Sequence, residues 1–327
     1  MKIKNTKCVL TTTIFVCLVF LLDCDEDDCN KYVSHSSIKN KKEMVLIYEN
    51  QFTQPCSIKD WVIEGPGKVE WQKGKMVLIP DAQAALYNKW EELGRKVLSV
   101  KEEYYTTIQQ SIEEVSPLMV GKLFNRSGSF SGGHVVCWNN KFETGGDYMV
   151  EYDFKPLSPI GLGIIFFSAR GCNGEDVLSD KLASRDGVFE RYTKGDINCY
   201  HISYWANNPT SGIRGSCNLR KNSGFYFLAA SIDPTARELD YFSKNFEFKK
   251  HKIRLIKTGS KIEFYIDGQL IIDFIDKQVN NIFENETAVS RKIVDTGRVL
   301  GGGRIGLRQM AGLKAEYSNF RVYTVNK

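Results

Sequence analysis

Short runs of alternating apolar and polar residues recur through most of this chain and constrain its fold more than any other feature. In "YMVEYDF" (148–154), Val150, Tyr152 and Phe154 alternate with more polar side chains, which is the period of a half-buried strand. The run "LGIIFFSA" (162–169) is apolar on both faces and predicts a central strand. Similar runs follow: "CYHISYW", "FYFLAAS", "KIEFYIDGQLIIDF" and "AEYSNFRVYTV". Many short antiparallel strands between residues 45 and 325 predict an all-β domain, a two-sheet antiparallel jelly-roll sandwich.

One segment departs from this pattern. Its apolar residues are spaced three or four apart and predict helix over about residues 82–116, either as one helix or as two that meet near Gly94. These residues are Leu86, Trp90, Leu93, Val97, Val100, Tyr104, Ile108, Ile112 and Val115. Pro117 ends the run, because proline cannot continue a helix. We interpret the segment as an insertion packed against the sheet, and the alternative is a lid or a partner-binding element.

The N-terminal residues have the features of a signal peptide. Lys2, Lys4 and Lys7 precede the uncharged run Val9–Leu22, which is short for a membrane-spanning helix. We therefore predict that residues 1–22 are a cleaved signal peptide and that the protein is secreted or extracytoplasmic. Residues 23–44 are acidic, then rich in serine, asparagine and lysine, and we interpret them as a linker. A membrane is an expected partner only if residues 1–22 are retained as an anchor.

The net charge argues against one class of partner. The whole chain has a formal net charge of +5, and removal of the three lysines in residues 1–22 leaves about +2. A charge-driven nucleic-acid binder needs a strongly basic surface, so we predict no nucleic-acid partner.

The cysteines are dispersed. No Cys-x-x-Cys pair or Cys/His cluster occurs, and we predict no metal site and no cofactor. In an exported chain, the cysteines outside residues 1–22 predict two or three disulfides, whose pairing the sequence leaves open. They are Cys24, Cys29, Cys56, Cys137, Cys172, Cys199 and Cys217.

Several motifs are similar to those of one known family. They are "MVEYDFKPLSPIGLGIIFFSARGCNGEDV", "YTKGDINCYHISYW", "CNLRKNSGF", "HKIRLIKTGSKIEFYIDGQ" and "GGGRIGLRQMAGLKAEYSNFRVY". On these motifs the chain resembles the YesU-like family of concanavalin-A-like jelly-roll proteins, which is associated with carbohydrate utilisation. The resemblance covers about residues 45–80 and 130–325, and residues 82–120 look like an insertion into it. It implies a jelly roll of lectin or glucanase type and a poly- or oligosaccharide partner, and it supplies no established reaction.

Strand alternation divides the polar side chains of "CYHISYW" (199–205) between two faces. Tyr200 and Tyr204 are expected on one face, and His201 and Trp205 on the other.

The same alternation orients "RIGLRQM" (304–310). Ile305 and Leu307 are expected to face the core together with Gln309, which leaves Arg308 on the opposite face. A jelly roll usually binds its glycan on the outward side chains of one sheet. We therefore expect Arg308 and His201 to lie in one ligand groove.

The residue types in this groove favour an acidic glycan, because arginine forms bidentate hydrogen bonds to carboxylates. A lyase-like reaction would use His201 and Tyr204 as catalytic residues that move a proton. The predicted substrate-binding residues are Arg308, Gln309, Asn218, Arg220, Tyr200, His134 and Trp205. Alternation places Tyr204 opposite His201, so both reach one groove only if a bulge or a strand end redirects a side chain.

Other interpretations stay open. A non-catalytic, lectin-like carbohydrate-binding module would use the same groove without proton transfer, and a structural or adhesion protein is a third possibility. His201 is equally consistent with a hydrogen-bonded structural histidine, and His134 with a residue of a surface loop. For Tyr200 and Tyr204 the favoured interpretation is a packing residue with a hydrogen-bonded hydroxyl.

A glucanase-type hydrolase is not supported. Such jelly rolls carry their carboxylates on one strand as E-x-D-x-x-E or E-x-D-x-E. Here Glu151 and Asp153 supply the first two, but Lys155 and Pro156 follow where the third is needed.

Overall fold

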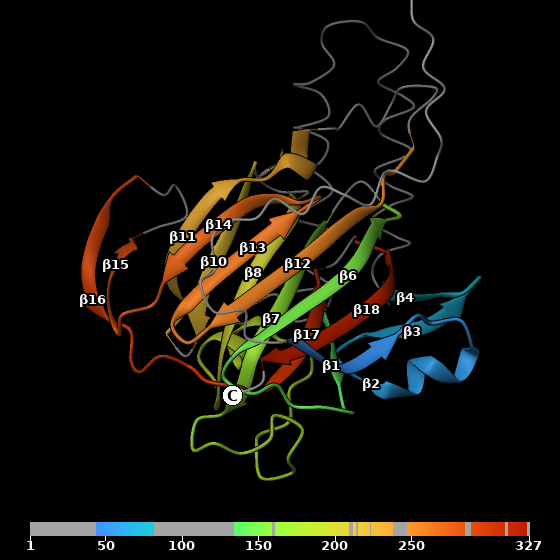
Figure 1. Cartoon of the computed structure of the whole chain (residues 1–327), viewed down its shortest axis with the longest axis horizontal. Helices are drawn as coiled ribbons and strands as arrows, with labels where there is room; N and C mark the ends of the chain where they lie inside the picture. The colour runs from blue at the N-terminus through green and yellow to red at the C-terminus, as the bar shows by residue number, and fades with distance from the viewer. Residues whose placement is uncertain are drawn as a thin grey trace, which may run out of the picture. The chain divides into compact units, whose positions relative to one another are not determined.

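Two antiparallel β-sheets, stacked one behind the other, make up the described part of the chain (Figure 1). The computed structural model describes residues 44–81, 134–158, 161–208, 212–213, 215–222, 224–237, 247–284, 289–310 and 313–325. In these ranges one sheet has eight strands and the other has ten. This architecture confirms the prediction of an all-β, two-sheet antiparallel jelly-roll sandwich.

The eight-stranded sheet has the strand order β14-β13-β12-β6-β18-β4-β3, and β1 also pairs with β18. Its strands are β1 (Met44–Asn50), β3 (Gly67–Gln72), β4 (Lys75–Pro80), β6 (Tyr148–Pro156), β12 (His251–Thr258), β13 (Lys261–Ile266), β14 (Gln269–Ile275) and β18 (Ala315–Val325).

The ten-stranded sheet has the order β16-β15-β11-β10-β8-β7-β17-β5-β2, and β9 pairs with β8. Its strands are β2 (Trp61–Glu64), β5 (Val135–Asn139), β7 (Gly161–Gly171), β8 (Ile197–Asn208), β9 (Gly212–Ile213), β10 (Ser216–Asn222), β11 (Tyr226–Ile232), β15 (Val279–Phe283), β16 (Arg291–Asp295) and β17 (Arg304–Gln309). Short helical turns in the described residues are η1 (Pro55–Asp60), α3 (Phe189–Thr193) and η2 (Pro234–Arg237).

The main core lies between the sheets, because the face that each sheet turns toward the other carries apolar side chains. Val150, Tyr152 and Phe154 of β6 fill it from the eight-stranded sheet, and Ile165 and Phe167 of β7 fill it from the other sheet. Burying a side chain of this kind stabilises the fold by about 1.5–3 kcal/mol. The apolar side chains of "YMVEYDF" therefore face the core, as its alternation predicts.

A second apolar cluster covers the other face of the ten-stranded sheet. Trp138 of β5 and Phe166 of β7 form it together with Val177 and Tyr192, which lie in the connection from β7 to β8. Strand β7 is thus buried on both sides, as its continuous apolar sequence predicts. We call the side of the ten-stranded sheet that is turned away from the other sheet the outer face.

The predicted helical insertion at 82–116 and the predicted signal peptide at 1–22 lie outside the described residues. The predicted linker, 23–44, lies outside them as far as residue 43, and β1 begins at Met44. Among the described residues we find no helix with the length and apolar character that a membrane span requires.

The expected disulfides are not formed among the described cysteines. Cys56, Cys137, Cys172, Cys199 and Cys217 form no disulfide with one another, and Cys137, Cys199 and Cys217 are buried in the strands. Burial raises the pKa of the Cys137 thiol, so this cysteine behaves as a small apolar side chain. Cys24 and Cys29 lie outside the described residues.

Candidate functional site

The outer face gathers polar and aromatic side chains in two rows that cross the strands. Directly paired residues of neighbouring antiparallel strands point to the same face, so the register defines each row. The first row consists of Arg220, His201, Phe166, Gly306 and Trp138. The second row consists of Asn218, Ser203, Ile164, Arg308, Val136 and Glu64. His201 and Arg308 therefore lie on the same face, in adjacent rows and two strands apart.

Arg308 lies on the outer face of β17, between β7 and β5, and is 2% exposed. Its Nε and Nη2 lie 3.1 and 2.6 Å from Nδ1 of His134. Its Cζ lies 4.9 Å from the ring centroid of Tyr192 and 5.6 Å from that of Phe189. Burial lowers the pKa of Arg308 to about 10, so the guanidinium stays charged at neutral pH.

His134 immediately precedes β5 and is buried, not placed in an exposed loop. Burial, and then the charge of Arg308, holds the pKa of this imidazole well below its ordinary value of 6.5. His134 is therefore neutral at physiological pH. It accepts hydrogen bonds from Arg308 without neutralising the charge of the guanidinium.

An aromatic layer lies beside Arg308. The ring of Phe166 stacks on Trp138 at 5.4 Å and on Tyr192 at 5.9 Å between centroids. Gly306 makes this layer possible, because a Cβ atom at that position would lie 2.5 Å from the Trp138 ring. The glycine of "RIGLRQ" thus leaves the space in which the indole lies against β17.

His201 packs between two aromatic rings. Its imidazole meets Phe166 edge to face at 5.6 Å and stacks on Phe225 at 5.8 Å. Nδ2 of Asn222 lies 3.2 Å from Nδ1 of His201. With the Asn222 amide as donor, the ring proton belongs on Nε2, and Nε2 is then a hydrogen-bond donor and not a base.

Two further predicted residues share this face. Arg220 is paired with His201 across the strands, and Asn218 is paired with Ser203. The Arg220 guanidinium lies 4.7 Å from the ring centroid of Phe225 and 4.2 Å from that of Phe227. The structure therefore brings together His201, Arg308, His134, Asn218 and Arg220.

Glu64 lies at the end of the second row and binds three neighbouring side chains, and no sequence motif pointed to it. Its carboxylate accepts hydrogen bonds from Nε1 of Trp138 at 3.0 Å, from Arg185 at 3.2 and 2.7 Å, and from the hydroxyl of Tyr192 at 2.9 Å. Arg185 and Tyr192 belong to the connection between β7 and β8, for which the sequence shows no periodic signal. Glu64 is the one acid in "WVIEGPG" (61–67), and this stretch gave no indication of these partners.

Two glycines hold the connection from β7 to β8 against β2. Gly65 and Gly187 have φ values of +93° and +83°. A Cβ atom on Gly187 would lie 2.1 Å from the carbonyl oxygen of His134, and one on Gly65 would lie 2.9 Å from the Cα of Gly187. Only glycine allows this approach, which places Glu64 within reach of Arg185 and Tyr192.

Three predicted site residues point to the inner face, into the core between the sheets. The hydroxyl of Tyr204 hydrogen-bonds to Tyr152 at 2.8 Å, and that of Tyr200 donates to Asp276. Nε2 of Gln309 donates to the Tyr317 hydroxyl at 2.9 Å. The strands themselves separate these side chains from His201 and Arg308, so they do not share a groove with them.

The predicted side of Trp205 is corrected. Alternation places Trp205 with His201, but its φ of +50° and a shift in the β7–β8 register interrupt the alternation. Its indole packs in the inner core, 6.5 Å from Phe154 and 6.4 Å from His251 between ring centroids.

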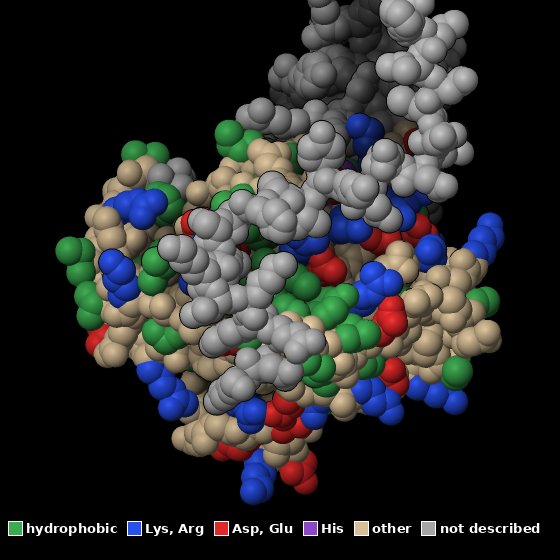
Figure 2. Space-filling model, viewed as in Figure 1, with side chains coloured by type: hydrophobic (Ala, Val, Ile, Leu, Met, Phe, Trp, Pro, Cys, Tyr) green, Lys and Arg blue, Asp and Glu red, His purple; other side chains and the backbone are tan. Residues whose placement is uncertain are grey.

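The eight-stranded sheet offers a contrast on its outward side. Figure 2 shows acidic and basic side chains interspersed over the surface turned to the viewer. Glu151 pairs there with Arg254, and Lys261 with Glu263, in partly exposed ion pairs. Asp153 pairs with Lys250. Each of these three acids is paired with a base on the same side of the sheet. No group of three His, Cys, Asp or Glu side chains in the described residues could hold a metal ion.

Comparison with known proteins shows that the chain belongs to one family. The family described as "Domain of unknown function (DUF1961)" matches residues 122–322. The uncharacterised protein YesU of Bacillus subtilis is 27% identical over 283 residues, which are 86% of this chain and 97% of YesU. These matches confirm the resemblance to the YesU-like family.

A solved structure shares the fold. The crystal structure of a Bacillus subtilis protein of unknown function with a galectin-like fold matches with a TM-score of 0.59 and 25% identity. The match covers 88% of this chain and 99% of that protein. The two-sheet sandwich described above is therefore also the fold of this relative.

Proposed function

Because this chain belongs to the DUF1961 family and shares a galectin-like sandwich with a solved relative, we propose that it is a carbohydrate-binding protein that recognises an acidic sugar on its outer face. The proposal rests on Arg308. Its guanidinium is the positive group that would bind the carboxylate of a uronic acid.

The observation that carries the proposal is the absence of a counter-ion. Arg308 is buried, and its only hydrogen-bond acceptor among the described residues is the neutral His134. Glu190 lies near enough to raise the pKa of Arg308 but makes no ion pair with it. An isolated buried ion costs several kcal/mol. A ligand carboxylate would offset this cost, because Nη1 of Arg308 donates no hydrogen bond to a described residue.

Two other buried cations in the described residues pair with acids. Arg185 forms an ion pair with Glu64 at 2.7 Å, and Lys221 forms one with Asp276 at 2.7 Å. Lys257, which is also buried, donates instead to the carbonyl oxygens of Gly146 and Gly259. Arg308 differs from these three cations because its acceptor is a neutral imidazole, which a binding role would explain.

The surroundings of Arg308 suit a sugar ring. The rings of Trp138, Phe166 and Tyr192 are buried beside Arg308 and would contact a sugar ring only after the side chains that cover them move. Asn218 and His201 are buried polar residues of the same face. Pockets for small ligands commonly combine aromatic walls with a few polar groups. Arg308 is 2% exposed, so entry of a carboxylate requires side chains such as that of Phe189 to move.

The test is a binding screen with purified protein. Isothermal titration calorimetry with polygalacturonate, alginate and hyaluronan fragments, and with dextran and mannan as neutral probes, measures the preference. We expect acidic fragments to bind and neutral ones not to. Arg308→Met should weaken acidic binding about 100-fold, because a hydrogen bond to a charged group contributes about 1.5–3 kcal/mol.

Arg254→Met is the matched control. Arg254 is a strand arginine on the outward side of the other sheet, where Glu151 pairs with it. This variant should bind acidic fragments like the wild type. Equal binding by Arg308→Met and the wild type would refute the proposal, as would equal binding of neutral and acidic fragments.

Cleavage of the bound glycan by a lyase-like elimination is the finer part of the proposal. Arg308 would stabilise the negative charge that forms beside the uronate carboxylate when the C5 proton leaves. His201 would remove that proton and pass it to the leaving oxygen as the C4–O bond breaks and the C4–C5 double bond forms. It can do so only with its ring proton on Nδ1, hydrogen-bonded to an Asn222 amide turned by half a rotation. Secretion would place the protein where such polysaccharides occur.

Absorbance at the unsaturated-uronate band tests this step on any acidic fragment that binds. A rise in absorbance that His201→Gln abolishes even at fragment concentrations that saturate its binding would support elimination. Binding without new absorbance or new reducing ends would identify the protein as a lectin-like module instead.

A further inference from the structure

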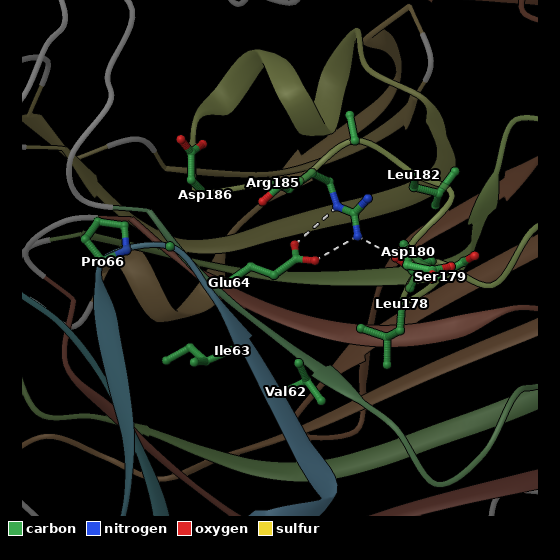
Figure 3. Close-up of a pocket in the computed structure, with 14 residues that line it drawn as sticks. Val62, Ile63, Glu64, Pro66, Leu178, Ser179, Asp180, Leu182, Arg185 and Asp186 are labelled. Carbon is green, nitrogen blue, oxygen red and sulfur yellow. Dashed lines mark hydrogen bonds and ion pairs between the residues drawn. The ribbon is translucent and has the colours of Figure 1, made fainter.

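A cleft with a volume of about 810 Å³ opens beside the second row, between β2 and the connection from β7 to β8. Figure 3 shows Glu64 and Arg185 pointing toward each other in it, with Leu178 and Leu182 on one side and Pro66 and Ile63 on the other. Glu64 belongs to the row that contains Arg308. The cleft therefore continues the outer face to the edge strand of the sheet.

One polar side chain of the cleft, Arg185, is buried, and one of its donor atoms has no hydrogen-bond acceptor in the described part of the chain. The Arg185 side chain is 4% exposed, and its Nη1 atom makes no hydrogen bond in the described part of the chain. The ion-pair distance from Nη1 to Oδ1 of Asp196 is 3.9 Å, which is too long for a hydrogen bond. A buried N–H without an acceptor is costly, so a ligand oxygen at this position would be stabilised.

The charge of the lining disfavours a second acidic sugar. Glu64, Asp180 and Asp186 line the cleft, against the single positive charge of Arg185. Ser179 and Ser184 add hydroxyl groups. Carboxylates and hydroxyls accept hydrogen bonds from sugar hydroxyls, whereas a uronate carboxylate would be repelled.

The cleft is connected to Arg308 through one side chain. The hydroxyl of Tyr192 donates to Glu64 at 2.9 Å, and the ring of Tyr192 lies 4.9 Å from Cζ of Arg308. A ligand that holds Glu64 and Arg185 in place therefore also holds the aromatic wall of the Arg308 site. Sheet strands are about 4.8 Å apart, so β2 and β17, separated by β5, lie about 10 Å from each other.

We propose that this cleft is a second subsite that binds an uncharged, hydroxyl-rich sugar next to the acidic sugar held by Arg308. This inference rests on the proposed function and narrows it to mixed oligosaccharides in which a uronic acid is linked to a neutral sugar. Arg185 donates to a sugar oxygen, and Asp180, Asp186 and Glu64 accept from sugar hydroxyls.

The experiment compares three probes by isothermal titration calorimetry. They are free glucuronate, a set of disaccharides that join a uronic acid to a neutral sugar, and digalacturonate. Ala183→Trp places a bulky ring at an exposed lining position, and Lys181→Trp is the control at an exposed neighbouring position outside the lining. Both changes lie on the surface connection, so the fold should tolerate them, which thermal denaturation checks.

We expect at least one mixed disaccharide to bind the wild type about tenfold more tightly than glucuronate, as one or two added hydrogen bonds would produce. Ala183→Trp should remove this gain and leave glucuronate binding unchanged, whereas Lys181→Trp should change neither. The inference is overturned if Ala183→Trp has no effect on the mixed disaccharides, or if digalacturonate binds best.

The glucuronate measurement separates the two ideas. If glucuronate and the mixed disaccharides both fail to bind the wild type, the proposed function fails and the subsite falls with it. If glucuronate binds through Arg308 and no mixed disaccharide binds more tightly, only the subsite is refuted.

Discussion

Arg308 and His134 form a buried pair in which the positive charge is not neutralised. Nη2 of Arg308 lies 2.6 Å from Nδ1 of His134, although the two residues are 174 positions apart in the chain. The imidazole accepts the hydrogen bond because burial and the charge of Arg308 keep it neutral. The fold thus buries a cation whose hydrogen-bond acceptor among the described residues is a neutral imidazole.

This pair predicts a pH-dependent stability. The pKa of His134 is lowered in the folded protein, whereas the unfolded chain takes up a proton near pH 6.5. The unfolded state therefore binds more protons as the pH falls, and the contribution of His134 to stability is complete above about pH 6.5 and is lost below it. Urea denaturation at about pH 7.5 and pH 5 measures the loss.

His134→Gln is the comparison, since its side-chain carbonyl can accept from Arg308 and does not titrate. The free energy of unfolding of the wild type should fall more between the two pH values than that of His134→Gln. An equal fall in both proteins would contradict the assignment of a neutral, buried His134.

Arg308 and Glu64 should differ in their effect on stability. Arg308→Met removes a buried charge that has no acidic partner, so we expect no net loss in the free energy of unfolding. Glu64→Ala leaves the buried Arg185 with only the 3.9 Å ion pair to Asp196 and should cost about 3–5 kcal/mol. Glu151→Ala, which breaks a partly exposed pair with Arg254, should cost about 0–1 kcal/mol.

Chemical denaturation of the three variants measures this series. If Arg308→Met were as destabilising as Glu64→Ala, Arg308 would be a structural residue and the binding proposal would lose its main support.

Substitutions of Tyr204 and His201 test which face of β8 binds the glycan. Tyr204→Phe removes a hydroxyl that bonds to Tyr152 between the sheets, and should cost about 1 kcal/mol. Glycan binding should be unchanged, because the strand separates Tyr204 from the outer face. His201→Gln should weaken binding with little effect on the melting temperature. Loss of binding or turnover in Tyr204→Phe would restore Tyr204 as a catalytic candidate.

Gly187 should be far less tolerant of substitution than another glycine of the same connection. Gly187→Ala combines a φ of +83° with a Cβ atom 2.1 Å from the His134 carbonyl oxygen. Overpacking of this kind costs about 1–3 kcal/mol beyond the backbone strain. Gly174→Ala has a φ of +94° but open space around the added atom, so it measures the strain alone. Equal melting temperatures for the two variants would argue against the close approach of Gly65 and Gly187.

Export of the protein remains a prediction from the N-terminal sequence. We expect the mature chain to begin after Leu22, because the apolar run Val9–Leu22 is short for a membrane span. N-terminal sequencing of protein recovered outside the cell checks this. Recovery of a chain that still begins with Met1 would indicate a retained anchor.

The alternation of apolar and polar residues was enough to predict the sandwich from the sequence, because side chains of a strand alternate between faces with a period of two. This rule was enough to separate His201 from Tyr204, and Arg308 from Gln309, without any knowledge of their neighbours. It failed at Trp205, where a residue with φ of +50° interrupts the alternation. A single backbone conformation of this kind leaves no periodic signal.

The partners of these side chains were decided by tertiary structure alone. Glu64 meets Tyr192 across 128 residues and Arg185 across 121. Such contacts depend on strand order, register and the close approach of Gly65 to Gly187. The sequence determined which side chains the outer face of each strand would carry. Only the packing of distant segments decided that Arg308 would be buried beside a neutral histidine, because no local pattern encodes which groups share a desolvated space.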